Sequence, residues 1–210
     1  MRRQNQASEY TLTELQIEKL IYSTDWPGKR ARSPEMVFRD RTLLKVLCYC
    51  ALRASEAAGL DWKDIDLRQG RMTAYGKGDK KRDLLFGIPY PDLASDLSAL
   101  KGRQTRGPVF VGKHGRQITR QGVLYVVQRA AEYAGIESPH PGHARPWVHL
   151  LRHSWVRNAR RRRPPVPWEH IQQWLGHDKV ATTMDTYGTP DTADTADAIA
   201  RSIRGGLDGA

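Results

Sequence analysis

The sequence predicts a mainly α-helical domain with one small antiparallel β-sheet, which places it in the α+β class. Apolar residues recur at helical spacing through most of the chain, whereas only residues 65–88 have the composition and turn signals of strands. The chain has 210 residues, of which 39% are hydrophobic. A chain longer than ~150 residues buries about 70% of its unfolded surface, so one core suffices without disulfides or a structural metal.

Eight helices are expected. The first follows Thr11 and Glu14, which have capping-box spacing, and it leaves residues 1–9 as a tail. The second carries Leu43 and Leu47 on one side and is expected to be the core helix. The last has aspartates in its first turn and arginines in its last, as the helix dipole favours. The expected ranges are 12–23, 37–52, 55–60, 91–100, 119–134, 149–162, 167–175 and 191–204.

Three short strands are expected between the third and fourth helices. Glycines flank Lys77 in the segment Gly76-Lys-Gly-Asp79, which is typical of a tight hairpin tip. The expected strand ranges are 65–67, 71–75 and 84–88.

The net charge is strongly positive. Thirty-four Lys and Arg against 23 Asp and Glu leave a charge of +11 and an isoelectric point near 9.9. This balance favours a polyanionic partner, of which nucleic acid is the usual one. From Arg145 to Trp168 there are seven arginines and no acid, and the cluster Arg160 to Arg163 within this stretch is either a solvated helix end or a surface that contacts phosphates.

The sequence also bears on cellular location. No run approaches the ~18 apolar residues of a membrane span, and no apolar stretch follows the two arginines at the start, so neither a membrane helix nor a secretory signal is expected. Cys48 and Cys50 lie close together in an apolar segment. That placement favours two reduced thiols in the core of a cytoplasmic protein over a disulfide.

Three segments put unusual polar residues into apolar surroundings. In the first, Arg53 precedes Glu56 by three residues, so that the acid can brace the guanidinium and leave other donors free. The second, His149-Leu-Leu-Arg152-His153, places a histidine and an arginine on one helical face. The third is Leu175-Gly-His177, followed by Thr182-Thr-Met-Asp-Thr-Tyr187.

These segments, with the Gly-Lys-Gly hairpin, occur in the order found in one enzyme family. From about Tyr10 to Thr189 the sequence resembles the catalytic domain of tyrosine recombinases, which include phage integrases and the bacterial Xer recombinases. The likeness extends to Gly59-Leu-Asp-Trp-Lys-Asp-Ile-Asp-Leu67. The resemblance implies the tyrosine recombinase catalytic-domain fold and a site-specific recombinase that cleaves and rejoins duplex DNA.

The resemblance also implies roles in binding the scissile phosphate. Arg53 and Arg152 correspond to the two arginines that grip it, and their forked donors suit the extra charge of a pentacoordinate transition state. Glu56 would support the first of them. His149 would assist proton transfer or bind a phosphate oxygen, and His177 would donate a further hydrogen bond.

Two further residues would carry the bond-breaking steps. By the resemblance, Tyr187 is the nucleophile that forms a 3′-phosphotyrosyl link to DNA. Lys77 would protonate the departing 5′ oxygen as general acid. Because the link conserves the energy of the broken bond, neither ATP nor a metal nor any other cofactor is implied.

Further basic residues are expected to contact DNA outside the reacting phosphate. They are drawn from the hairpin and from the arginine-rich helix, and each could instead be a solvated charge. The residues are Lys80, Lys81, Arg82, Arg157, Arg160 and Arg161.

The domain organisation departs from that of the family. Residues 10–189 are expected to form the catalytic domain, and residues 190–210 a C-terminal helix or tail. The resemblance leads us to expect that the helical core-binding domain, which family members normally carry in front of the catalytic domain, is absent here. The resemblance implies a homo-tetramer on paired recombination sites, with no membrane partner. The apolar stripe of the last helix could dock on a neighbouring subunit or pack on its own domain.

Some of these residues, taken singly, also fit other interpretations. The histidines His140, His143, His149 and His153 have spacings that would also suit a metal ion, although both cysteines are far away in the sequence. Ala51 stands where the family usually has glycine, which is costly if that position needs a positive φ. For the whole chain, the alternatives are a non-catalytic DNA-binding regulator or excision factor and a DNA-relaxing enzyme of the type IB topoisomerase kind.

Overall fold

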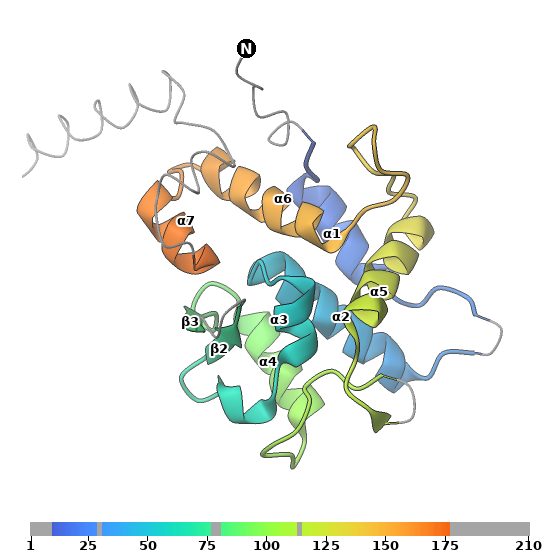
Figure 1. Ribbon diagram of the computed structural model, residues 1–210, viewed down its shortest axis with the longest axis vertical. Coiled ribbons are helices and arrows are strands. Elements are labelled where there is room, and N and C mark those ends of the chain that lie inside the picture. Colours follow the sequence, from blue (N-terminus) through green and yellow to red (C-terminus); the bar gives the residue numbers. More distant parts are fainter. Residues whose placement is uncertain (1–9, 29–30, 77–80, 113–114, 177–210) are drawn as a thin grey trace, which may run out of the picture.

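The computed structural model describes residues 10–28, 31–76, 81–112 and 115–176. Within these ranges it confirms the predicted class, because helices form the body of the molecule and a three-stranded antiparallel sheet lies at its edge (Figure 1). The helices are α1 (Glu14–Tyr22), α2 (Pro34–Tyr49), α3 (Ala54–Gly59), α4 (Pro91–Lys101), α5 (Arg120–Tyr133), α6 (Val148–Arg161) and α7 (Trp168–Leu175). The strands are β1 (Ile65–Asp66), β2 (Arg71–Tyr75) and β3 (Lys81–Leu85), and a 3-10 turn, η2 (Trp62–Asp64), precedes β1. The expected helix at 191–204 and the hairpin tip at 77–79 lie outside the described residues.

Helix α2 is the centre of the core, as predicted. It begins at a capping serine followed by Pro34, whose fixed φ suits the first helical position. Its second half is buried on almost every side, and it packs against α1, α4, α5 and α6 (Figure 1). The fully buried leucines include Leu43, Leu44 and Leu47.

The start of α1 differs from the prediction. The capping residue is Thr13, whose hydroxyl accepts a hydrogen bond from the backbone N–H of Gln16 (3.2 Å), while the Gln16 side chain accepts one from the Thr13 N–H (2.9 Å). The predicted capping box of Thr11 and Glu14 is therefore wrong. The reason is tertiary: Leu12 is buried, and its backbone N–H donates to a serine hydroxyl of α6 (2.9 Å), which holds this residue in an extended segment before the helix.

The sheet is a meander in the order β1-β2-β3. In the β2–β3 pair, Met72 lies opposite Leu84 and Ala74 lies opposite Arg82, and these four side chains face the core. The third strand runs over Lys81–Leu85 rather than the predicted 84–88. The three extra residues at its start bring two basic side chains into the strand, which the sequence interpretation had assigned to the turn.

The remaining sequence expectations concern cysteines and membranes. Cys48 and Cys50 are both buried, and both are free thiols, as predicted. Burial raises the pKa of the Cys50 thiol to about 12, so it remains protonated at neutral pH. In the described part of the chain, no helix combines the length and the apolar character that crossing a bilayer requires.

Two glycines allow the chain to close the base of the hairpin. A β-carbon placed on Gly87 would lie 2.7 Å from the Cα atom of Gly70, which is closer than real side chains approach. The backbones are held at this distance by a hydrogen bond from the Gly87 N–H to the Gly70 carbonyl (2.9 Å). Gly70 also has φ +61°, whereas Gly87 has no positive φ, so substitution of Gly87 tests the close contact alone.

Gly87→Ala is expected to lower the free energy of unfolding by about 2 kcal/mol, the typical cost of forcing extra volume into a packed site. The matched control is Gly59→Ala, because a β-carbon there meets nothing within 4 Å and alanine favours a helix. Urea unfolding followed by circular dichroism measures both. Equal stabilities of the two variants would contradict the close-contact argument.

Candidate active site

The first arginine of the expected site lies at the sharp turn between α2 and α3. Arg53 is the N-cap residue of α3, with extended backbone angles. Its backbone N–H donates to Glu56 Oε2 (2.9 Å), and its side chain donates from Nη1 to Glu56 Oε1 (2.6 Å). The prediction that Glu56 braces this guanidinium is thus matched by the geometry.

Glu56 is a buried carboxylate shared by two arginines. Besides Arg53, it accepts a hydrogen bond from Arg82 Nη2 (2.7 Å). Its side chain is only 1% exposed, while that of Arg53 is 36% exposed and that of Arg82 is 7% exposed. Arg53 is therefore the partner that a ligand can reach from solvent.

The electrostatics keep this carboxylate ionised. Burial raises the pKa of Glu56, but the charge of Arg82 and the hydrogen bonds from Arg53 and Arg82 outweigh it and hold the pKa below its usual value. The buried acid thus carries a full negative charge at neutral pH.

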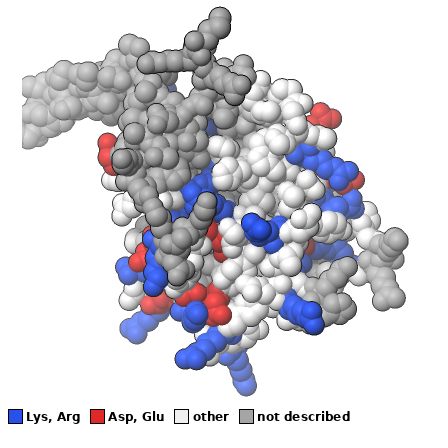
Figure 2. Space-filling model, viewed as in Figure 1, with Lys and Arg blue, Asp and Glu red and all other residues white. Residues whose placement is uncertain are grey.

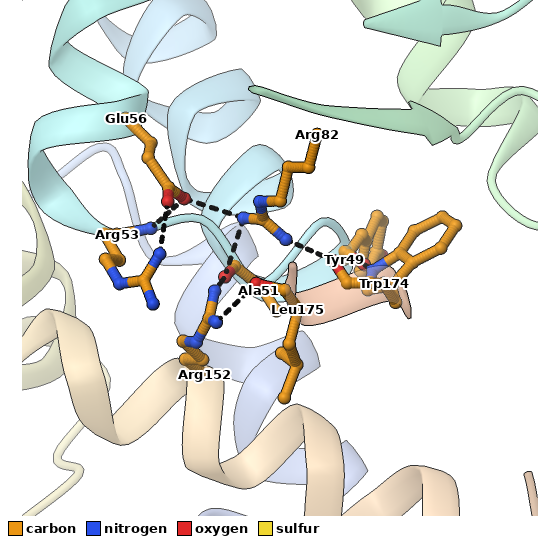
Figure 3. A network of polar contacts seen from close by, with 8 residues as sticks. All are labelled: Tyr49, Ala51, Arg53, Glu56, Arg82, Arg152, Trp174 and Leu175. Atoms are coloured by element: carbon orange, nitrogen blue, oxygen red, sulfur yellow. Dashed lines mark hydrogen bonds and ion pairs between the residues drawn. The ribbon is translucent and has the colours of Figure 1, made fainter. Parts of the chain in front are cut away.

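Arg82 does not occupy the position that the sequence interpretation gave it. It was expected to contact DNA, but its side chain points inward from β3 and is buried (Figure 3). Its guanidinium donates to Glu56, to the Ala51 carbonyl (3.4 Å) and to the Trp174 carbonyl. The assignment of Arg82 to the DNA surface is corrected for this reason. The alternation of β3 is the signal that was missed, because Arg82 is two residues before the inward-facing Leu84.

The second arginine of the expected site comes from α6. Arg152 is 1% exposed and donates from Nη1 to the Ala51 carbonyl (2.7 Å) and from Nη2 to the Leu175 carbonyl (2.7 Å) (Figure 3). These two bonds fix the plane of its guanidinium. They also tie the turn before α3 to the C-terminal end of α7.

The backbone at Ala51 is strained in the way that the usual glycine of the family suggests. Its φ is +51°, the one positive value for a non-glycine residue in the described part of the chain. This conformation turns the Ala51 carbonyl toward Arg82 and Arg152, which both donate to it. It also explains why α2 ends at Tyr49 rather than at the predicted residue 52.

Two histidines lie on the same helix as Arg152. His149 is exposed, and its ring centroid is 5.3 Å from that of His153. Although part of the ring is open to solvent, the surrounding protein desolvates it, and this desolvation, together with the nearby charges of Arg152 and Arg53, lowers the pKa of His149. His149 is therefore neutral at physiological pH, the form in which an imidazole can accept a proton. Burial, followed by the effect of His149, lowers the pKa of His153 to about 4.

Helix α7 is anchored beside the site by aromatic side chains. Trp174 stacks on Trp155 of α6 with ring centroids 5.8 Å apart, and its indole N–H donates to the Tyr49 carbonyl (3.3 Å). Trp155 in turn donates to the Tyr90 hydroxyl (3.0 Å). The helix ends at Gly176 in the left-handed conformation. The carbonyls of its last two residues accept hydrogen bonds from the two buried arginines, Arg82 and Arg152.

Several predicted site residues lie outside the described residues. These are Lys77, Lys80, His177 and Tyr187. Their assignments stay predictions.

The other basic residues expected to contact DNA divide by exposure. Lys81 and Arg161 are exposed, and Arg157 is half-buried. Arg160 donates to the Val166 carbonyl (2.9 Å) and lies over the Trp168 ring (4.9 Å to the centroid). On the face shown in Figure 2, Lys and Arg side chains are more widespread than Asp and Glu.

The histidines fall into two groups. His140 and His143 pack with Trp147, whereas His149 and His153 form a pair on α6. Among the residues that the structure describes, no three His, Cys, Asp or Glu side chains come together in a group that could hold a metal ion.

Comparison with known families places the geometry in context. Residues 11–193 match the Phage integrase family, a span that includes every helix and strand of the described structure. The chain belongs to the phage integrase family. Tyrosine recombinase XerD of Mycobacterium leprae is 35% identical over 181 residues, which are 81% of this chain and 54% of that protein. XerD of Neisseria meningitidis is 34% identical over 180 residues, 82% of this chain and 56% of that one. The chain thus spans about half the length of these relatives.

Solved structures of the family share the fold. The crystal structure of XerA recombinase superposes with a TM-score of 0.67 at 22% identity and covers 91% of this chain and 64% of that one. The XerH site-specific recombinase bound to its difH substrate gives a TM-score of 0.65 at 24% identity, with 90% of this chain and 53% of that one covered. The expected tyrosine recombinase catalytic-domain fold is thereby confirmed.

Glu56→Gln is expected to lower the free energy of unfolding by about 3 kcal/mol near pH 7, the lower end of the range for a broken buried ion pair, because glutamine keeps an acceptor oxygen. Since the folded pKa of Glu56 is lowered, its contribution is complete above the unfolded value of about 4.3 and is lost as the pH falls through the folded pKa. The stability gap between wild type and variant should therefore narrow in acid.

Chemical denaturation at a series of pH values measures this gap. Asp83→Asn is the control, because Asp83 is an exposed carboxylate on the neighbouring strand. A gap that stays constant down to pH 2.5 would show that Glu56 is not the ionised partner of the two arginines.

Proposed function

We propose that this chain is the catalytic domain of a site-specific DNA recombinase, which cleaves and rejoins duplex DNA through a covalent tyrosine intermediate. The observation that carries the proposal is that Arg53 and Arg152 lie together at one turn of the chain (Figure 3), with His149 near enough for both charges to lower its pKa. The family match, over residues 11–193, spans these residues together with Lys77, His177 and Tyr187. Solved relatives bound to DNA substrates support duplex DNA as the partner.

In the proposed reaction, Arg53 and Arg152 bind the non-bridging oxygens of the scissile phosphate. A guanidinium carries five N–H donors in a rigid fork and stays charged, so two of them offset the charge that develops on a pentacoordinate phosphorus. Glu56 holds the Arg53 fork in place from behind (2.6 Å). His149, neutral because its pKa is lowered, would accept or relay a proton at the same phosphate. His177 would donate a further hydrogen bond there.

One residue is assigned to each side of the scissile phosphate, the nucleophile to the attacking side and the general acid to the leaving 5′ oxygen. The Tyr187 oxygen attacks phosphorus and loses its proton, the 5′ oxygen leaves, and Lys77 supplies a proton to that oxygen. The product is a 3′-phosphotyrosyl link and a free 5′ hydroxyl. Attack of another 5′ hydroxyl on this link restores the backbone and releases the tyrosine.

Basic residues outside the reacting centre would bind the flanking backbone. Lys80, Lys81, Arg157, Arg160 and Arg161 are proposed to contact phosphates on either side of the cleaved one, which positions the duplex without reading its sequence. Arg82 is not among them, since it is buried.

Tyr187→Phe is expected to abolish covalent protein–DNA adducts while DNA binding is retained, because phenylalanine keeps the ring but lacks the nucleophilic oxygen. A nicked suicide substrate carrying the recombination site of the host replicon traps the adduct, which denaturing gels detect. Tyr125→Phe is the control, since Tyr125 is an exposed tyrosine on α5 (58%). Adducts that persist in Tyr187→Phe would disprove the assignment of the nucleophile.

Lys77→Ala is expected to slow cleavage by about 10²- to 10⁴-fold, the usual contribution of a general acid. A substrate with sulfur at the 5′ bridging position needs no proton on its leaving group, so it should restore the rate. Lys101→Ala, at the end of α4, provides a matched control. If the slow rate remains with the sulfur substrate, Lys77 is not the acid.

Assembly on DNA is the last part of the proposal. We propose a homo-tetramer on paired sites, in which residues 190–210 dock on a neighbouring subunit through the stripe Ala193, Ala196, Ile199, Ala200 and Ile203. A lambda integrase tetramer bound to a Holliday junction supports such an assembly for this fold.

Deletion of residues 190–210 is expected to weaken assembly on a two-site substrate at least tenfold while single-site binding changes little. Analytical ultracentrifugation with labelled DNA separates the two. Unchanged assembly would assign the stripe to packing within its own subunit.

A further inference from the structure

Arg82 is the buried charge in this site to which no role has been assigned. It lies on the inward face of β3 opposite Ala74 of β2, whose small side chain is itself buried. The side chain of Arg82 is 7% exposed, so it cannot act as a surface contact. A buried guanidinium of this kind requires partners that repay the loss of its hydration.

The partners come from three different parts of the chain. Arg82 donates to Glu56 of α3, to the Ala51 carbonyl in the turn before it, and to the Trp174 carbonyl at the end of α7 (Figure 3). Arg152 bonds the Ala51 carbonyl as well, and also the carbonyl of Leu175. The two arginines together connect the α2–α3 turn to the last turn of α7.

The end of α7 is also packed on the apolar stem of Arg82. A β-carbon on Gly176 would lie 2.7 Å from the Cδ atom of Arg82, and Gly176 has φ +66°. Glycine is therefore required here by both the backbone conformation and the contact. The glycine of the Leu-Gly-His segment thus fits against Arg82, and His177 follows directly in the sequence.

The charge balance gives Arg82 a specific effect on Arg53. Glu56 carries one negative charge and accepts from both arginines, Oε1 from Arg53 and Oε2 from Arg82. With Arg82 present, the buried carboxylate is neutralised from the inner side, and Arg53 keeps a net positive charge toward solvent. Without Arg82, the same carboxylate would be balanced by Arg53 alone.

We infer that Arg82 is a positioning residue: it neutralises Glu56, so that the charge and donors of Arg53 remain available for a phosphate. The inference rests on the proposed function, in which Arg53 binds the scissile phosphate, and it adds a residue that does not itself touch DNA. Arg82 acts through Glu56.

Four variants test the inference in single-turnover cleavage of the suicide substrate. Arg82→Met removes the charge and keeps most of the side-chain volume, and Arg82→Lys keeps the charge on a shorter side chain. The double variant Arg82→Met/Glu56→Gln removes both buried charges. Arg71→Met is the matched control, because Arg71 is an exposed arginine on the adjacent strand.

Arg82→Met is expected to slow cleavage about 10²-fold, the scale of loss for a displaced or weakened charge-stabilising group, while DNA affinity changes less than threefold. The double variant should recover to within about tenfold of wild type, because Arg53 is then no longer neutralised. Arg82→Lys should likewise stay within about tenfold. A double variant as slow as Arg82→Met, or an Arg82→Met variant as fast as Arg71→Met, would overturn the inference.

A second readout needs neither DNA nor activity. Loss of Arg82 removes the largest of the effects that lower the pKa of Glu56, so the Glu56 pKa should rise in Arg82→Met and stay low in Arg82→Lys, as measured by carbon NMR of the glutamate carboxyl. If Arg82→Met does not fold, Arg82→Lys and the double variant still decide the outcome by their rates and unfolding curves.

The two proposals can fail separately. A wild-type chain that forms no adduct, with the Glu56 pKa responding to Arg82 as stated, would reject the recombinase function and leave the charge coupling standing. A Glu56 pKa that is the same in wild type and in Arg82→Met would reject the coupling, even in a chain that cleaves DNA.

Discussion

The arrangement of the site depends on one buried carboxylate. Glu56 is 1% exposed, yet it stays ionised because Arg82 approaches it from the core and Arg53 from the solvent side (2.7 and 2.6 Å). A carboxylate in this environment without cationic partners would be neutral, and neither guanidinium would then be held. Glu56 therefore serves to hold Arg53 in position and does not itself take part in the chemistry. The turn after α2 and strand β3 are both tied to this carboxylate, the first through Arg53 and the second through Arg82.

The carbonyl of Ala51 is a second fixed point, and it depends on backbone conformation. An alanine in the left-handed region costs about 1–2 kcal/mol, and the family resemblance implies glycine there. In return, the conformation presents one oxygen to Arg152 and Arg82 (2.7 and 3.4 Å). Arg152 also donates to the Leu175 carbonyl (2.7 Å), so its buried guanidinium is held at the turn by two backbone oxygens.

The sequence predicted most of the fold because its helices carry strong local signals. Helices α4 to α7 lie within about two residues of their expected bounds, since capping residues, proline and glycine mark their ends. The errors occurred where tertiary contacts determine the local structure. Leu12 bonds to α6 and so precedes the first helix instead of belonging to it, and β3 begins at Lys81 rather than at residue 84. The pairing of Arg53 with Glu56 was predictable from their spacing, whereas the carbonyl of Ala51, which two arginines share, and that of Leu175 were not. Every residue has a carbonyl oxygen, so a sequence pattern does not show which carbonyl will accept a hydrogen bond.

The tolerance of alanine at position 51 follows from the packing of α7. The Ala51 methyl group is fully buried in a small cluster with Val156 of α6 and Ile171 and Leu175 of α7. Burial of one methyl group contributes about 0.8 kcal/mol, which offsets roughly 40–80% of the strain of about 1–2 kcal/mol from the positive φ. Glycine would relieve the strain but lose the contact and cost more backbone entropy on folding. The residue whose backbone turns its carbonyl toward the arginines thus also packs its methyl group against α7, so the strained turn and the end of α7 stabilise each other.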